Sequence, residues 1–127
     1  MLAPLLLLAT AQAGTIDVTF NDLASGETFQ WTEAIADQGP TALTLAFPDH
    51  TGELALLVTA LEEDQVQLDL EVWEVRARRL RADKRELLSQ PRLLTRHGAG
   101  CSFTVGTRAA DGSETGFSVE MLTTPGS

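Results

Sequence analysis

The chain is poor in several residue types, and each shortage excludes a class of protein. Its single cysteine, Cys101, excludes an internal disulfide framework and leaves only a bond between two chains. It has no tyrosine and only two tryptophans, too few for an aromatic-lined sugar cleft. The formal charge of −9 disfavours binding to nucleic acid or to an anionic membrane through the overall field. The length of 127 residues suits one domain.

Basic residues are missing from the first 75 positions. That stretch has a charge of −13, whereas residues 76–108 hold all nine basic residues and two acidic ones, a charge of +7, and residues 109–127 add −3. The segment RARRLRADKRE, residues 76–86, is called the basic arm here. The pattern predicts that the arm either folds back on acidic faces of its own domain or docks an acidic partner. Its candidate interaction residues are Arg76, Arg78, Arg79, Arg81, Lys84 and Arg85.

Apolar runs are short, and the clearest one lies in the first 13 residues, MLAPLLLLATAQA. It is too short to span a bilayer as a helix. Ala11 and Ala13 are the small residues that a signal peptidase accepts, so residues 1–13 are predicted to be a signal peptide. The alternative is a buried N-terminal strand or helix. Without a cysteine after the run, a lipoprotein anchor is excluded, and we expect a periplasmic or secreted protein that has no membrane span once the signal is removed.

From Gly14 onward, apolar and polar residues alternate with a period of two, which predicts β-strands. Turn residues separate the alternating runs, and almost no helical pattern is present. The predicted fold is all-β, a single small sandwich or open barrel of mostly antiparallel strands over residues 14–127. The expected strands cover residues 15–20, 27–33, 41–47, 53–61, 65–75, 92–95, 101–105 and 117–121.

Three local features of this pattern are ambiguous. The alternation in residues 65–75 changes phase at Val72 and Trp73, which predicts a β-bulge there. The basic arm fits either a helix or the tip of a long hairpin, and flanking strand signals favour the hairpin. Residues 34–36 are expected to form a short helical turn before the breaker Asp37–Pro40.

The sequence predicts no catalytic, metal or cofactor site. His50 and His97 lie in turns without a serine in a nucleophile setting, and both are expected to be solvated. Cys101 shares its face with Phe103 and is expected to be a small buried side chain. The acidic run at residues 62–64 lacks the ligand spacing of a calcium loop, and zinc would need more cysteines.

One alternative function rests on carboxylates. Asp69 and Glu71 share one strand face, as paired carboxylates do in glycoside hydrolases. With His97 they could serve a secreted ligand-binding or hydrolytic β-sandwich. That hypothesis requires the three side chains to converge on one concave site.

Three segments in order resemble the core β-domain of bacterial secretins, the outer-membrane channels of type II and type III secretion and of pilus systems. VQLDLEVWEV, residues 66–75, is similar to the strand that opens that core. LLSQPRLLTRHGAGCSFTVG, residues 87–106, is similar to a second segment, and GFSVEMLTTP, residues 116–125, to the strand that follows. The matching positions are Glu74, Val75, Ser89, Pro91, Arg92, Leu93, Leu94, Thr95, Val105 and Gly106.

The resemblance covers residues 66–125 and departs from the family where secretins carry their gate and transmembrane hairpins. Only the basic arm stands at that place here, and Cys101 replaces a usual alanine. The resemblance therefore implies a shortened relative that is no channel by itself. It implies a non-enzymatic periplasmic domain that binds an envelope or secretion-system protein, or itself, in protein secretion or pilus-type assembly.

Overall fold

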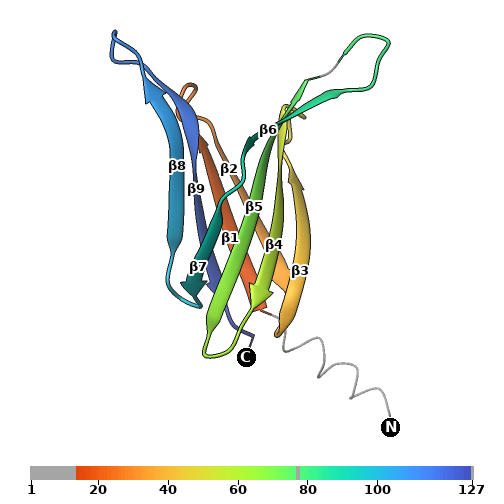
Figure 1. The fold of residues 1–127 in the computed structure, drawn as a ribbon, viewed down its shortest axis with the longest axis vertical. Helices are drawn as coiled ribbons and strands as arrows, with labels where there is room; N and C mark the ends of the chain where they lie inside the picture. The colour runs from red at the N-terminus through yellow and green to blue at the C-terminus, as the bar shows by residue number, and fades with distance from the viewer. Residues whose placement is uncertain (1–13, 77, 127) are drawn as a thin grey trace.

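A computed structural model describes residues 14–76 and 78–126, so the predicted signal peptide lies outside the described residues. These residues form nine antiparallel strands and no helix (Figure 1). The strands are β1 (Gly14–Asp22), β2 (Thr28–Ile35), β3 (Gly39–Ala46), β4 (Gly52–Ala60), β5 (Gln65–Arg76), β6 (Lys84–Ser89), β7 (Arg92–Arg96), β8 (Cys101–Arg108) and β9 (Glu114–Thr124).

The strands build two sheets that pack face to face. One sheet has the order β2-β1-β9-β8, and the other has the order β3-β4-β5-β6, with β7 also paired to β5. Strands β6 and β7 together therefore form one interrupted edge along β5. No strand pair within the described residues joins the two sheets into a closed barrel, so the predicted all-β sandwich is confirmed.

The period of two places apolar side chains between the sheets. In β1 the inward residues Ile16 and Val18 are 0% exposed, and in β5 the inward residues Leu68 and Leu70 are at most 1% exposed. Burying each such side chain contributes about 1.5–3 kcal/mol to folding. The inward faces of β1, β3, β5 and β9 follow the predicted period of two, and β4, which is apolar on both faces, is central between β3 and β5.

The predicted irregularity at Val72 and Trp73 is confirmed, but the extra residue lies on the neighbouring strand. Val72 pairs with Ser89 and Trp73 with Leu87, so Leu88 of β6 has no partner across the ladder. Strand β5 itself keeps its alternation, with Trp73 on the outer face. A bulge bends its strand and increases its twist, and the β5–β6 hairpin projects beyond the end of the sandwich (Figure 1).

Two expectations are corrected. Ala34 and Ile35 belong to β2 and not to the expected helical turn. They pair with Thr15 and Gly14 of β1, and these ladder hydrogen bonds outweigh the local helical pattern. His97 is half-buried rather than solvated, and its Nδ1 lies 3.0 Å from the hydroxyl of the buried Thr123. That threonine comes from the far end of β9, a contact that no local pattern indicates.

Candidate interaction surface

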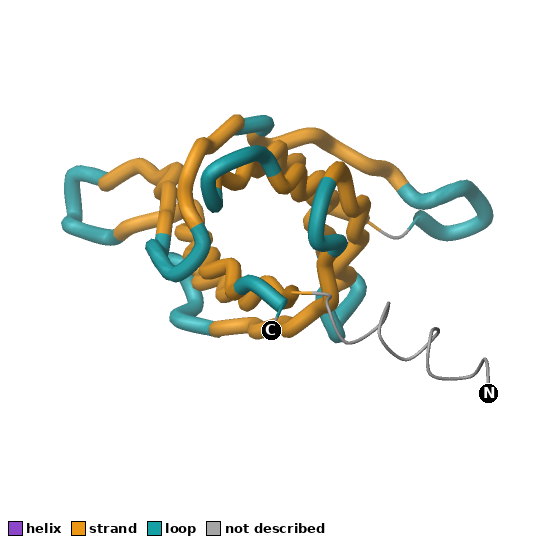
Figure 2. Tube along the Cα trace, turned by 90° about the horizontal axis from the view of Figure 1, so that it is seen from below, coloured by secondary structure: helices purple, strands orange, loops and turns teal. Residues whose placement is uncertain are grey.

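The basic arm forms the end of the β5–β6 hairpin, so the preference for a hairpin over a helix is confirmed for its described residues. Arg76 lies opposite Lys84 in the last rung of the ladder, and residues 78–83 make the tip. The four residue steps from Arg76 to Leu80 span at most roughly 14 Å. Figure 2 shows this hairpin and the β8–β9 hairpin projecting to opposite sides of the sandwich.

The base of the hairpin is neutralised by its own domain. The Nε of Arg76 lies 2.7 Å from a carboxylate oxygen of Glu74. Arg85 crosses the outer face of Trp73, with its guanidinium carbon 5.0 Å from the ring centroid, and pairs with Glu53 of β4. A cation over an exposed aromatic ring contributes about 0.5–1 kcal/mol. These contacts anchor the hairpin to the sheet.

The tip of the hairpin is not neutralised in this way. The ion pairs found within residues 14–76 and 78–126 include none of the three tip arginines, nor Lys84 next to the tip. The tip side chains are exposed, and Leu80 is 99% exposed with a left-handed φ of 63°. The tip therefore does not fold back on acidic faces of its own domain. The unpaired cations are Arg78, Arg79, Arg81 and Lys84.

The face of the β5–β6 hairpin opposite to Trp73, called its inner face here, carries two cross-strand pairs of charged residues. Glu74 lies opposite Glu86, and two residues further along Arg76 lies opposite Lys84. We call these the acidic rung and the basic rung. Like charges directly opposite each other in a ladder are destabilising. The bond between Glu74 and Arg76 along β5 relieves one side of this repulsion, whereas Glu86 and Lys84 have no ion pair among the described residues.

An apolar pocket opens between the sheets at the end from which the hairpins project. It has a volume of about 480 Å³, within the range of ligand pockets. Its floor includes Phe20, Phe47 and Phe117. The Phe20 ring stacks on that of Phe117 with centroids 5.3 Å apart, and the Phe47 ring packs against Phe20 at a tilt with centroids 4.7 Å apart. The carboxylates of Asp22 and Glu74 lie at its lining. We call this pocket the aromatic mouth.

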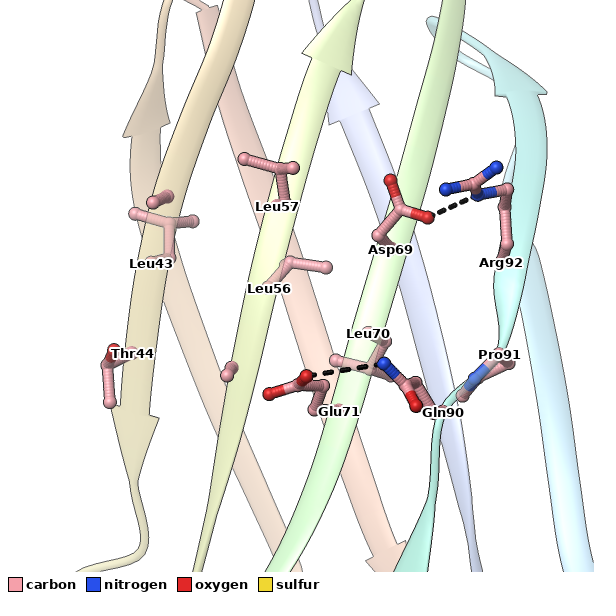
Figure 3. A pocket seen from close by; sticks show the side chains of 12 residues that line it. Leu43, Thr44, Leu56, Leu57, Asp69, Leu70, Glu71, Gln90, Pro91 and Arg92 are labelled. Carbon is pink, nitrogen blue, oxygen red and sulfur yellow. Dashed lines mark hydrogen bonds and ion pairs between the residues drawn. The ribbon is translucent and has the colours of Figure 1, made fainter. Parts of the chain in front are cut away.

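A second, shallow groove lies on the outer face of the β3-β4-β5 sheet and has a volume of about 640 Å³ (Figure 3). Asp69 and Glu71 both line it, but His97 does not. Arg92 donates from Nε to Asp69 at 2.5 Å, and this bond holds the pKa of the carboxyl below its ordinary value. Glu71 accepts bonds from Trp73 at 3.1 Å and from the Gln90 amide at 3.3 Å.

The residues of the secretin-like segments lie mainly on the broken edge β6–β7. The carbonyl of Pro91 accepts the Leu70 N–H at 3.0 Å, so this proline lies at the sheet edge just before β7, where its missing N–H breaks no ladder bond. Half-buried positions among these residues are Glu74, Val75, Ser89, Pro91, Leu93 and Thr95, and exposed ones are Arg92, Leu94, Val105 and Gly106. They belong to one sheet edge and to the β8–β9 pair, not to one pocket.

Cys101 shares its core-facing side with Phe103, as predicted, but it is half-buried rather than buried. Burial raises the pKa of its thiol, so the thiolate is disfavoured. The described residues contain no group of three or more side chains placed to ligate a metal ion.

Sequence reasoning missed three features of this surface: the exposed Leu80, the anchoring role of Trp73, and the aromatic mouth. The phase change at Trp73 was a usable signal for the second of these, because an exposed aromatic ring can hold an arginine over its face. Nothing in the described part of the chain is a helix long and apolar enough to cross a membrane. Comparison with protein families, with curated proteins and with solved structures found no match. The secretin relationship and export stay predictions.

Proposed function

We propose that this chain is an exported, non-enzymatic β-sandwich that acts by binding protein, with the basic hairpin as its contact surface. The observation that carries the proposal is a projecting tip whose three arginines, with Lys84 next to them, have no ion pair among the described residues. Arginine side chains bind carboxylates through paired hydrogen bonds, so the complementary surface is acidic.

The class of partner follows from the secretin-like segments. An envelope or secretion-system protein is the partner that this resemblance favours, with a role in protein secretion or pilus-type assembly. Strand β8 offers a second route of contact because it is an exposed edge with Val105 40% exposed. An extended segment of a partner can pair with such an edge.

The test compares residues 14–127 with a variant in which Arg78, Arg79 and Arg81 are replaced by glutamine. Both are used to capture proteins from an envelope extract of the organism that carries the gene, and a captured protein is then purified for a binding titration. We expect the variant to lose at least about tenfold in affinity, and high salt to weaken the wild type. Arg96→Gln, at the opposite end of the sandwich, is the control and should bind like the wild type. Equal binding by the triple variant would refute the role of the tip.

The alternative, a ligand-binding or hydrolytic function, would have to use the groove of Figure 3 without His97, which does not line it, so the required convergence of three side chains is not met. Asp69 and Glu71 line that groove, but their oxygens already accept hydrogen bonds from neighbouring side chains. A general acid needs a raised pKa, whereas that of Asp69 is lowered. These observations support binding by the hairpin over hydrolysis in the groove.

A further inference from the structure

We infer that the partner of the hairpin is a second copy of this chain, related by a two-fold axis that sets the two hairpins antiparallel on their inner faces. This inference rests on the proposed function and names its partner. It rests on the acidic rung (Glu74 and Glu86) and the basic rung (Arg76 and Lys84), which lie two residues apart on one face of one hairpin.

The order of the rungs makes the surface self-complementary. In an antiparallel pair of hairpins, the basic rung of each copy lies against the acidic rung of the other. A two-fold interface requires such a patch, because the same residues meet from both sides. Both rungs pair like charges within one copy, so the isolated hairpin holds repulsions that a second copy converts into attractions.

The charge of the whole chain favours the same partner. Residues 76–85 carry six basic residues and one acidic residue, a charge of +5, and the rest of the chain therefore carries −14. The hairpin projects away from the acidic body that could neutralise it (Figure 1). A second copy supplies that acidic surface without any further molecule.

In this dimer the exposed tip of each hairpin docks in the aromatic mouth of the other copy. Leu80 is 99% exposed, and the mouth lies at the same end of the molecule as the hairpin. When two copies meet at this end, each tip faces the mouth of the other. Its apolar floor suits a leucine, and Asp22 in its lining suits one of the flanking arginines, Arg79 or Arg81.

Sedimentation velocity of residues 14–127 over a range of concentrations tests the inference. We expect a reversible dimer that weakens at about 1 M salt, where the Debye length falls to about 3 Å. Leu80→Asp should weaken it at least about tenfold, since the substitution removes an apolar side chain and adds a charge. Arg96→Glu, at the opposite end, should leave it unchanged. A chain that stays monomeric at all concentrations, or a Leu80→Asp variant that dimerises like the wild type, overturns the arrangement.

A charge swap gives the sharpest test. One variant carries Glu74→Lys with Glu86→Lys, so that both rungs are basic, and the other carries Arg76→Glu with Lys84→Glu, so that both are acidic. Each variant alone should be monomeric, and an equal mixture should form a heterodimer. A mixture that stays monomeric, with both variants folded by circular dichroism, overturns the inference.

The outcome separates this inference from the proposed function. If the wild type is monomeric but the glutamine variant of the tip loses an envelope protein, the partner is another acidic protein and the self-pairing is refuted. If the monomer instead binds vesicles that contain anionic lipid, the partner is a membrane surface, and both proposals fail.

Discussion

Replacing Gly116 by alanine should destabilise the sandwich by about 4 kcal/mol. Gly116 has a φ of +117°, a conformation that costs about 1–3 kcal/mol for a residue with a side chain. An added Cβ would also lie 2.0 Å from the carbonyl oxygen of Val105 and 2.6 Å from the Cα of Gly106. Because both contacts are to backbone, relief requires the β8–β9 pair to separate, and such overpacking costs about 1–3 kcal/mol more.

Substitutions at two other glycines, Gly112 and Gly106, measure the backbone cost and the contact cost separately. Gly112 has a φ of +89° but no atom within 4 Å of an added Cβ, so Gly112→Ala reports the backbone cost alone, about 1–2 kcal/mol. At Gly106 the φ is ordinary and the Cβ would lie 2.9 Å from the Thr115 carbonyl oxygen, so Gly106→Ala reports a close contact alone. We expect a smaller loss from each than from Gly116→Ala.

Urea unfolding of residues 14–127, followed by tryptophan fluorescence, measures the three losses of unfolding free energy. The linear extrapolation is valid if the slope with urea is unchanged among the variants. If Gly116→Ala lowers the free energy of unfolding no more than Gly112→Ala does, β8 and β9 do not approach each other closely at the Gly106–Gly116 pair. The reasoning about this hairpin would then be refuted.

Three further predictions concern other parts of the fold. Leu68→Ala should reduce the free energy of unfolding by about 2–5 kcal/mol, because Leu68 is 0% exposed between the sheets, and a loss below about 1 kcal/mol in urea unfolding would contradict that burial. Arg92→Gln should raise the pKa of Asp69 towards its ordinary value of 3.8, measured by NMR titration of the carboxyl. Since the pKa of Asp69 is lowered in the folded state, the stability linked to it is present above the ordinary value and is lost as the pH falls below it. The free energies of unfolding of wild type and Arg92→Gln should therefore become equal in acid, and a difference that persists there would contradict this cause. In the β4–β5 turn, Glu63 and Asp64 both have left-handed φ values, 59° and 63°, so replacing them by Asn and Gly should raise the thermal midpoint, with a gain of about 1 kcal/mol. A lower midpoint would show that the turn does not need this backbone geometry.

The sequence by itself determined the inward faces of the sandwich. Alternation is a property of each strand alone, since successive side chains point to opposite faces whatever the partner strand is. Val66 to Val72 could therefore be assigned to the core before any pairing was known, and so could Val119 and Met121. The hairpin at the basic arm was also predictable, because strand patterns flank it on both sides.

Only the tertiary structure decided which residues meet across the sheets and along the hairpin. Register between strands is set by long-range pairing, so neither the opposition of Glu74 and Glu86 nor that of Arg76 and Lys84 can be read from spacing in the chain. The same holds for the aromatic mouth, since Phe47 follows β3 of one sheet and Phe117 lies in β9 of the other. It also holds for His97, which the sequence places in a turn but the fold places against Thr123 of β9. The concentration of basic charge was visible in the sequence, but its projection from the domain follows from a bulge whose extra residue, Leu88, lies on the partner strand.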